Sequence, residues 1–265
     1  MNSKDIFTDE ELLNLLKNKY SLYEICDKLK VCKSTVCRRM KLLGVSTFDY
    51  KLDTHVFDVI DTEEKAYWLG FLFADGYIGS KNTHIGLCLS SVDRSHLEKF
   101  IKIFKYRKEH ITDTVAKCNG KEFKCCKWSL SNPHLHATLN NLGCVPNKSL
   151  ILKFPKKEIF KNEDLIYDFI RGYVDGDGCL WLNQKGKLTI EIMGTKEFLE
   201  GILEYFPNKM TLGHKDKRRP DSNTYRLIGC ASNALNICSK LYDDASVYLE
   251  RKYLKYKTAV SNSNI

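Results

Sequence analysis

Apolar and polar positions follow the same order twice along this chain. Residues 67–76 form an apolar, helix-like run that closes on Asp-Gly, and residues 169–178 form a second run that closes the same way. Gly70 and Gly172 align at the same offset as the two Asp-Gly pairs, which is 102 residues. A pattern repeated at one offset indicates two copies of a structural unit. The chain from about residue 60 onward is therefore predicted to be duplicated.

Polarity alternates after each apolar run, which is the period-two pattern of a strand with one buried face. The alternation covers residues 84–90 in the first copy and residues 188–193 in the second. A helical pattern follows in each copy, at about residues 93–104 and 195–205. Each copy thus continues from its apolar helix into strands and then into a second helix.

A hairpin and a last helix complete each copy. Asn119-Gly120 predicts the turn of the first hairpin, and residues 217–221 predict that of the second. Ser131-Asn132 and Ser232-Asn233 each open a further helix. The predicted fold class is α+β, with the order αββαββα present twice.

Capping residues predict where the repeats begin. Asp61 with Glu64 three residues later is expected to form a capping box, and Asn162 takes the same place in the second copy. The predicted boundaries are a first repeat at residues 61–150, a second at 163–258, a linker at 151–162 between them and a tail at 259–265.

Residues 1–44 have a helical pattern of their own, which predicts a small three-helix module. Thr8 is expected to cap the first helix, and Gly44 is expected to stop the third. Residues 45–60 lack a sustained period and are predicted to be a linker.

The third helix of this module has a cationic outer face, with four cations and no acid from Lys33 to Leu43. Its spacing resembles the helix-turn-helix DNA-binding family, in which the third helix is the recognition helix. The resemblance implies base contacts from Ser34, Thr35 and Arg38, and phosphate contacts from Lys33, Arg39 and Lys41. A solvated basic face used for protein contacts is the alternative.

Small residues recur every fourth position in the two apolar runs. Ala66, Gly70 and Ala74 form one stripe, and Gly172 and Gly176 belong to the matching one. Such stripes let two helix backbones approach closely. The helices are therefore expected to cross, with an aspartate at the C-terminal end of each.

The ionised forms of those two aspartates, Asp75 and Asp177, are disfavoured by the negative ends of their helix dipoles and by each other's charge. A bound cation would relieve both effects. Oxygen ligands with open positions suit Mg²⁺ held jointly with substrate phosphates, and such an ion can activate water for phosphodiester hydrolysis.

Residues 68–76 and 170–178 resemble the two signature motifs of the LAGLIDADG homing endonucleases, and both keep the defining glycine and Asp-Gly. The resemblance covers about residues 60–258. It implies a monomer whose two pseudo-symmetric halves form a saddle on double-stranded DNA, with each sheet in the major groove. Asp75 and Asp177 would bind Mg²⁺ or Mn²⁺, and both strands would be cut across the minor groove. The backbone groups that complete the metal site stay open.

The resemblance also implies a basic catalytic residue late in each half. Lys148 lies 73 residues after Asp75, and Lys252 lies 75 residues after Asp177. Both lysines are expected to polarise water or stabilise charge on the phosphorane. Two other positions depart from the repeat: Asp175 is expected to be a helix-end group outside the symmetric pair, and Arg171 is expected on a solvated side.

Positive charge is clustered within a net charge of +9. Residues 102–127 hold eight Lys or Arg against three acids, and residues 207–226 hold six against two. Clustered basic charge favours a nucleic-acid partner. The strand register that decides which side chains face DNA stays open, so the candidates form one group: Lys117, Lys121, Lys124, Lys127, Lys215, Lys217, Arg218, Arg219 and Arg226.

The eleven cysteines include no Cys-x-x-Cys pair and no secretory segment precedes them, which predicts reduced thiols. The expected location is the cytoplasm of a bacterial or phage-infected cell, or an organelle matrix. A zinc site is the less favoured interpretation, because close cysteine pairs are missing; its ligands would come from Cys118, Cys125, Cys126, His134 and His136. The longest apolar run, residues 66–74, is too short to cross a membrane.

The leading hypothesis is a site-specific homing endonuclease of a mobile genetic element. One alternative is a DNA-binding regulator that has lost cleavage, although both motif aspartates are present. The other is an RNA-binding intron maturase, because basic saddles bind either nucleic acid. Target sequence, cut positions, host and intron association stay open.

Overall fold

The computed structural model describes residues 7–18, 20–45, 52–105, 111–118, 120–215 and 222–263. The chain divides into two compact units. Unit 1 comprises Met1–Thr54 and Lys99–His110, and unit 2 comprises His55–Glu98 and Ile111–Ile265. Within the described ranges, no helix is long and apolar enough to cross a membrane.

Three helices build the N-terminal part of unit 1: α1 (Asp9–Lys17), α2 (Leu22–Leu29) and α3 (Lys33–Leu42). They share an apolar core that consists of Phe7, Leu12, Leu16, Ile25, Val36 and Met40. Thr8 caps α1 in a capping box with Glu11, and Gly44 has the left-handed φ of +65° that suits a helix stop. The predicted three-helix module and both of its end signals are confirmed. Ser21 and Glu24 form a second capping box, on α2, that was not predicted.

The two copies have the same element order. The first copy contains α5 (Glu63–Asp75), β1 (Gly76–Ile78), β2 (His84–Ser90), α6 (Arg94–Lys102), β3 (Thr112–Cys118), β4 (Lys121–Ser131) and α7 (Pro133–Asn141). The second contains α8 (Asp164–Asp177), β5 (Gly178–Leu182), β6 (Leu188–Gly194), α9 (Lys196–Tyr205), β7 (Thr211–His214), β8 (Tyr225–Cys230) and α10 (Ser232–Tyr242). The predicted α+β class and the repeated αββαββα order are confirmed.

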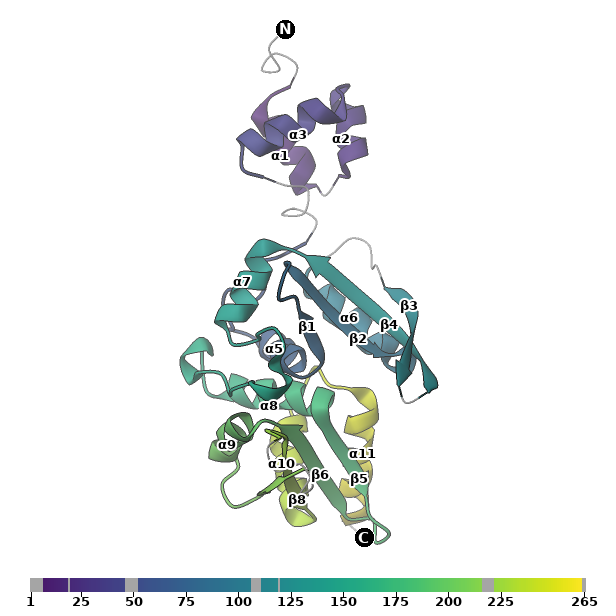
Figure 1. Cartoon of the computed structure of the whole chain (residues 1–265), viewed down its shortest axis with the longest axis vertical. Coiled ribbons are helices and arrows are strands. Elements are labelled where there is room, and N and C mark those ends of the chain that lie inside the picture. Colours follow the sequence, from purple (N-terminus) through teal and green to yellow (C-terminus); the bar gives the residue numbers. More distant parts are fainter. Residues whose placement is uncertain are drawn as a thin grey trace. The chain divides into compact units, whose positions relative to one another are not determined.

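Each copy contributes one antiparallel sheet of four strands. The strand orders are β1-β2-β4-β3 and β5-β6-β8-β7, which are equivalent under the repeat. Figure 1 shows α5 and α8 side by side between the two sheets. The alternating apolar residues of β2 and β6 are buried, as expected for strands with one core face.

The first hairpin forms where it was predicted. Cys118 pairs with Lys121 at its end, and Gly120 has a φ of +74°, which glycine adopts without strain. Asn119 lies outside the described residues, and so do residues 217–221, the predicted turn between β7 and β8.

The capping prediction for the two motif helices is wrong in detail. Thr62, not Asp61, caps α5 by accepting a hydrogen bond from the Lys65 amide, while Asp61 pairs with the Lys65 side chain at 2.8 Å. Asn162 accepts a hydrogen bond from the Leu165 amide at 3.2 Å but lies one residue before the α8 cap position. In α5, the Thr62 hydroxyl, one residue after Asp61, was the better placed acceptor.

Two segments contain more structure than expected. A last helix, α11 (Glu250–Ser263), follows the second copy. In the part of the predicted linker that belongs to unit 2, Val56, Phe57 and Ile60 are buried, and Ile60 pairs with Phe160. Short 3-10 turns lie at Ser91–Asp93, Lys148–Leu150 and Lys157–Ile159.

Candidate active site

The site is built where α5 and α8 cross. A Cβ atom placed on Gly70 would lie 1.9 Å from the Phe169 carbonyl oxygen, and one placed on Gly172 would lie 1.9 Å from that of Tyr67. No side chain fits in that space, so glycine is required at both positions. The predicted close crossing along the small-residue stripes is confirmed.

The crossing brings the ends of both helices together. Asp75 and Asp177 are the last residues of α5 and α8. A Cβ atom on Gly176 would lie 3.4 Å from a carboxylate oxygen of Asp75, so this carboxylate lies against the end of the opposite helix. Asp75 faces solvent and Asp177 is half-buried, which leaves both within reach of an ion.

Burial disfavours the ionised form of both carboxyl groups. Protein atoms packed around the Asp75 carboxylate remove part of its hydration, and this raises its pKa to about 6, helped by the negative charge of Asp177. Burial also raises the pKa of Asp177, while the positive charges of Lys148 and Lys252 act in the opposite direction. A cation between these groups would favour both ionised forms.

Lys148 and Lys252 bind equivalent backbone oxygens in the two copies. The Lys148 ammonium group donates to the carbonyl of Gly76 at 2.6 Å, and the Lys252 ammonium group donates to that of Gly178 at 2.5 Å. Each of these glycines directly follows a motif aspartate. The structure therefore places both predicted lysines beside the ends of the motif helices, where their charges also act on the aspartates.

Lys252 is much more enclosed than its counterpart. It is only 3 % exposed and also donates to the carbonyls of Val174, Asp175 and Gly176, at 2.7, 2.7 and 3.3 Å. Burial lowers its pKa to about 8 despite the favourable charge of Asp175. The cation compensates the negative end of the α8 dipole and holds the turn that carries Asp177.

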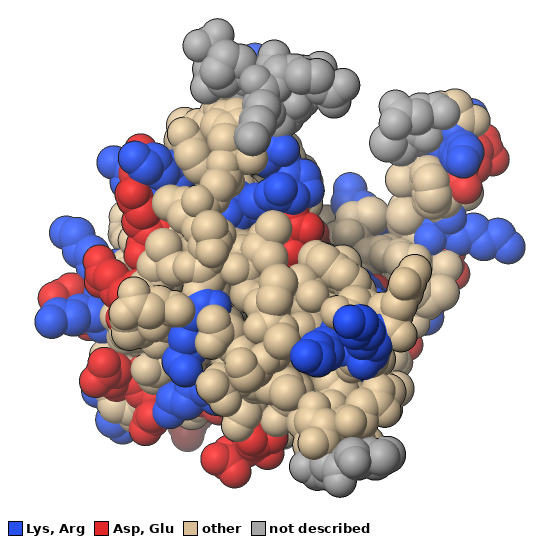
Figure 2. Space-filling model, turned by 90° about the horizontal axis from the view of Figure 1, so that it is seen from below, with Lys and Arg blue, Asp and Glu red and all other residues tan. Residues whose placement is uncertain are grey.

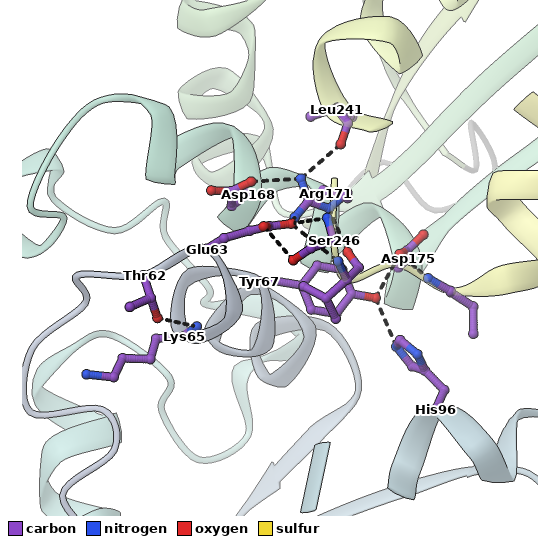
Figure 3. A network of polar contacts seen from close by, with 12 residues as sticks. Thr62, Glu63, Lys65, Tyr67, His96, Asp168, Arg171, Asp175, Leu241 and Ser246 are labelled. Atoms are coloured by element: carbon purple, nitrogen blue, oxygen red, sulfur yellow. Dashed lines mark hydrogen bonds and ion pairs between the residues drawn. The ribbon is translucent and has the colours of Figure 1, made fainter. Parts of the chain in front are cut away.

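Asp175 and Arg171 form buried polar contacts between the two copies (Figure 3). Asp175 accepts hydrogen bonds from Tyr67 of α5 and Tyr242 of α10, at 2.7 and 2.6 Å. Tyr67 also contacts His96 at 2.9 Å. Asp175 thus lies inside the protein and outside the symmetric pair of motif aspartates, as expected.

The predicted solvated position of Arg171 is wrong. Arg171 is 2 % exposed and pairs with Glu63 of α5 and with Asp168, both at 2.7 Å. Its guanidinium group also donates to the carbonyls of Leu241 and Val247. An arginine in place of an apolar residue in a helix does not indicate which distant acid will pair with it. The sequence therefore could not reveal that Arg171 is buried in an ion pair with Glu63.

A pocket of about 210 Å³ opens beside the helix ends. Its lining includes Ala74, Lys148, Tyr173 and Asp177. Tyr173 donates a hydrogen bond to the Met193 carbonyl at 2.9 Å, which fixes its ring beside the acid. The site thus combines carboxylate oxygens, a lysine and a solvent-accessible hollow.

The donor set fits a hard divalent cation. Both acids supply oxygen atoms, burial raises the pKa of both, and neither is sealed from solvent. Mg²⁺ and Mn²⁺ prefer such carboxylate oxygens and keep other positions for water or phosphate.

Strand register now separates the basic residues into two groups. Lys121 and Lys127 alternate with buried Cys126 and Trp128, so they lie on the open face of the first sheet. Lys124 shares the opposite face, where Lys117 pairs with Glu122 at 3.0 Å.

In the second sheet, Arg226 lies on the open face of β8, and the next residue, Leu227, is buried on the other face. It contacts Glu191 at 3.5 Å, and Lys215 contacts the same carboxylate at 3.1 Å. Lys217, Arg218 and Arg219 lie outside the described residues. Figure 2 shows one face of the molecule, on which Lys and Arg gather in separate groups with uncharged surface between them.

In unit 1, the proposed recognition residues differ in their surroundings. Lys33, Ser34 and Arg38 of α3 are exposed, as a contact surface requires. Arg39 instead forms an ion pair with Asp9 of α1, and the Thr35 hydroxyl lies 3.2 Å from the Cys32 sulfur. Arg39 therefore has a structural partner that the sequence pattern did not indicate.

Comparison with solved structures supports this fold, while a scan against protein-family models and a search of curated proteins give no match. The homing endonuclease I-WcaI bound to its DNA recognition sequence matches with a TM-score of 0.53 and 12% identity, over 74% of this chain and 87% of that one. I-GzeII in complex with its DNA target gives 0.40 and 14% over 75% and 88%, and a mesophilic variant of I-DmoI gives 0.45 and 13% over 69% and 97%. With two motif helices crossing between two equivalent sheets, the chain has the double-motif fold of the LAGLIDADG homing endonucleases.

Proposed function

We propose that this protein is a site-specific DNA endonuclease that makes a metal-dependent double-strand break. One observation carries the proposal: Asp75 and Asp177 lie at the ends of two crossing helices, where burial raises the pKa of both carboxyl groups and both remain accessible. A single Asp-Gly pair can simply end a helix in a turn and does not by itself indicate a metal site. Two in one solvent-accessible site provide the oxygen ligands for Mg²⁺ or Mn²⁺.

In the proposed mechanism, Asp75 and Asp177 would hold a divalent ion, each from its own copy. Such an ion would supply a lowered pKa of bound water and stabilisation of the leaving oxygen. Lys148 and Lys252 fix the turns that carry the two acids and add positive charge near the phosphate. Because Lys252 already serves four carbonyls, we assign it a positioning role and assign direct contact with phosphate or water to the more open Lys148.

Double-stranded DNA is the proposed partner, contacted by the open faces of both sheets. Lys121, Lys127 and Arg226 lie on those faces. The homing endonuclease I-WcaI is solved with DNA, which supports the same partner here. We further propose that the chain acts as a monomer, since it carries both copies of the motif.

The central test uses the full-length protein and an Asp75→Asn, Asp177→Asn double variant. Both are incubated with genomic DNA fragments of a host that lacks the insertion, with Mg²⁺ or Mn²⁺, and double-strand ends are mapped by sequencing. The wild type should cut at few sites, and the variant should bind the same sites without cutting. Tight binding with no cleavage under either ion would instead indicate the regulator, and selective binding and splicing of an intron RNA would indicate the maturase.

We also propose that α3 extends the DNA contact as a recognition helix. Arg38→Ala should shorten the protected footprint and weaken binding by about 1–3 kcal/mol, as expected for loss of a base contact. Lys17→Ala on α1 is the matched control, because it also removes one exposed cation from unit 1. An unchanged footprint with Arg38→Ala would remove this helix from the interface.

A further inference from the structure

A second group of possible metal ligands lies away from the paired aspartates. His55 and Asp58 precede α5, and His134 lies in the first turn of α7. His55 Nδ1 lies 2.7 Å from one Asp58 oxygen, and His134 Nε2 lies 2.7 and 3.0 Å from the two oxygens. Residues that are 76 positions apart in the chain thus share one carboxylate.

The three ligand atoms are arranged compactly enough for one ion. They all lie within 4.8 Å of one another, and the three side chains are exposed. Zinc–nitrogen bonds of 2.0–2.1 Å in tetrahedral geometry require ligand atoms about 3.3 Å apart. The contacts to Asp58 would therefore lengthen by roughly half an ångström on metal binding.

Neighbouring groups orient the cluster. The Thr138 hydroxyl donates to an Asp58 oxygen at 3.1 Å, and the rings of His55 and His134 lie 4.1 Å apart between centroids. Burial raises the pKa of Asp58, but hydrogen bonds from the two imidazoles outweigh that effect and lower it overall. Carboxylates that bind a metal are themselves usually held by a hydrogen bond, and the Thr138 hydroxyl supplies one to Asp58.

The ligand types in the cluster indicate which metal ion it suits. His55 Nδ1 and His134 Nε2 both lie against the Asp58 carboxylate. Two imidazole nitrogens and one carboxylate oxygen select zinc over magnesium, because magnesium prefers oxygen ligands only.

We propose that His55, Asp58 and His134 form a zinc site with a fourth position open to water. The ion would tie the segment before α5 to the start of α7 and so stabilise the first copy. This site is separate from the paired aspartates, and it stands whether or not the protein cleaves DNA. It also revises the zinc interpretation from the sequence. His136 Nε2 donates a hydrogen bond to the Gly79 carbonyl at 2.8 Å, whereas His134 Nε2 lies against Asp58.

Zinc titration of the chelator-treated, full-length protein by calorimetry tests the proposal. We expect one tight equivalent in the wild type and at least tenfold weaker binding at this site in His55→Ala and in His134→Ala. His136→Gln is the matched control, since it removes an imidazole two residues away on α7 while keeping a donor for Gly79. The Asp75→Asn, Asp177→Asn variant should retain the tight equivalent, which separates this site from the catalytic proposal.

Spectra of the wild type avoid any effect of substitution on folding. Long-range ¹H–¹⁵N correlations should show His55 Nδ1 and His134 Nε2 shifting on addition of one equivalent of zinc, with no such shift on addition of magnesium. Unchanged ring nitrogens at saturating zinc, or undiminished tight binding in both alanine variants, would overturn the site.

Discussion

The two copies place a lysine at the same backbone oxygen but surround it differently. Lys148 lies in a short 3-10 turn, is half-buried, and donates to the Gly76 carbonyl. Lys252 lies in α11, is almost fully buried, and donates to four carbonyls at the end of α8. The same chemical contact is therefore peripheral in one copy and part of the core in the other.

The motif helices differ in the same direction. At matching positions, the first copy has Leu69 and Phe73 where the second has Arg171 and Asp175, and all four are buried. The first copy fills this space with apolar side chains, while the second fills it with charges that are paired across the helix crossing. The two copies thus share the backbone arrangement, but one fills these buried positions with apolar side chains and the other with paired charges.

The largest effect is expected from Arg171→Leu, which gives α8 the residue found at the matching position of α5. It leaves Glu63 and Asp168 without their buried cation, at a cost of about 3–5 kcal/mol in the free energy of unfolding. Urea denaturation measures this. Arg94→Leu is the control, because its ion pairs are exposed and worth less than about 1 kcal/mol. Equal losses in both variants would mean that the buried charges are not the distinguishing feature of the second copy.

Removing each lysine tests the comparison directly. Lys252→Met leaves several buried carbonyls without donors and should cost about 3 kcal/mol, whereas Lys148→Met should cost about 1 kcal/mol. Under the proposed function, Lys148→Met should nevertheless lower the cleavage rate at saturating DNA by at least tenfold. Thermal or urea unfolding beside single-turnover cleavage separates the two roles. A larger stability loss with Lys148→Met would reverse the assignment.

A smaller, opposite effect is expected from Asp75→Asn in the absence of metal. The pKa of Asp75 in the folded protein is raised from 3.8 to about 6, so its ionisation opposes folding. The wild type should therefore lose stability relative to the variant as pH rises from about 4 to about 6, and the difference should then stay constant. Because Asp75 is exposed, we expect only roughly 1 kcal/mol at pH 7. Unfolding curves at pH 4 and pH 7 that give the same difference would contradict this.

The smallest effect concerns metal affinity. Protons compete with Mg²⁺ for Asp75, whose pKa of about 6 means that acidification from pH 7 to pH 6 neutralises close to half of it. Mg²⁺ affinity should therefore fall about twofold over this interval. Calorimetric titration at the two pH values measures it, with the paired-aspartate double variant as the control for metal bound elsewhere. An affinity that rises on acidification would place the ion away from Asp75.

Much of the fold was predictable because its signals are local. Periods of 3.6 and 2 residues, a turn glycine at Gly120 and capping at Thr8 act within a few positions of each other, and the structure confirms them. The crossing at Gly70 and Gly172 was also predictable, since only small residues allow backbones to meet.

The DNA-facing residues could not be predicted in the same way. Lys124 and Lys127 are three positions apart in β4, so they lie on opposite faces, and only the packing of the sheet shows that Lys127 is on the open one. A shift of one residue would exchange those faces, and nothing in the local sequence excludes it.

The sequence by itself determined the duplicated αββαββα order, the close helix crossing and the two aspartates at its end, because repeats, small-residue stripes and periodicity are written along the chain. Only the tertiary structure decided that Arg171 is buried, that Lys252 serves four carbonyls while Lys148 stays open, and that His55 and Asp58 meet His134. These outcomes depend on partners that lie 70 or more residues away, as in the 70-residue separation of Arg171 from Leu241. Burial and charge pairing arise between elements, so they are fixed by packing rather than by any local pattern.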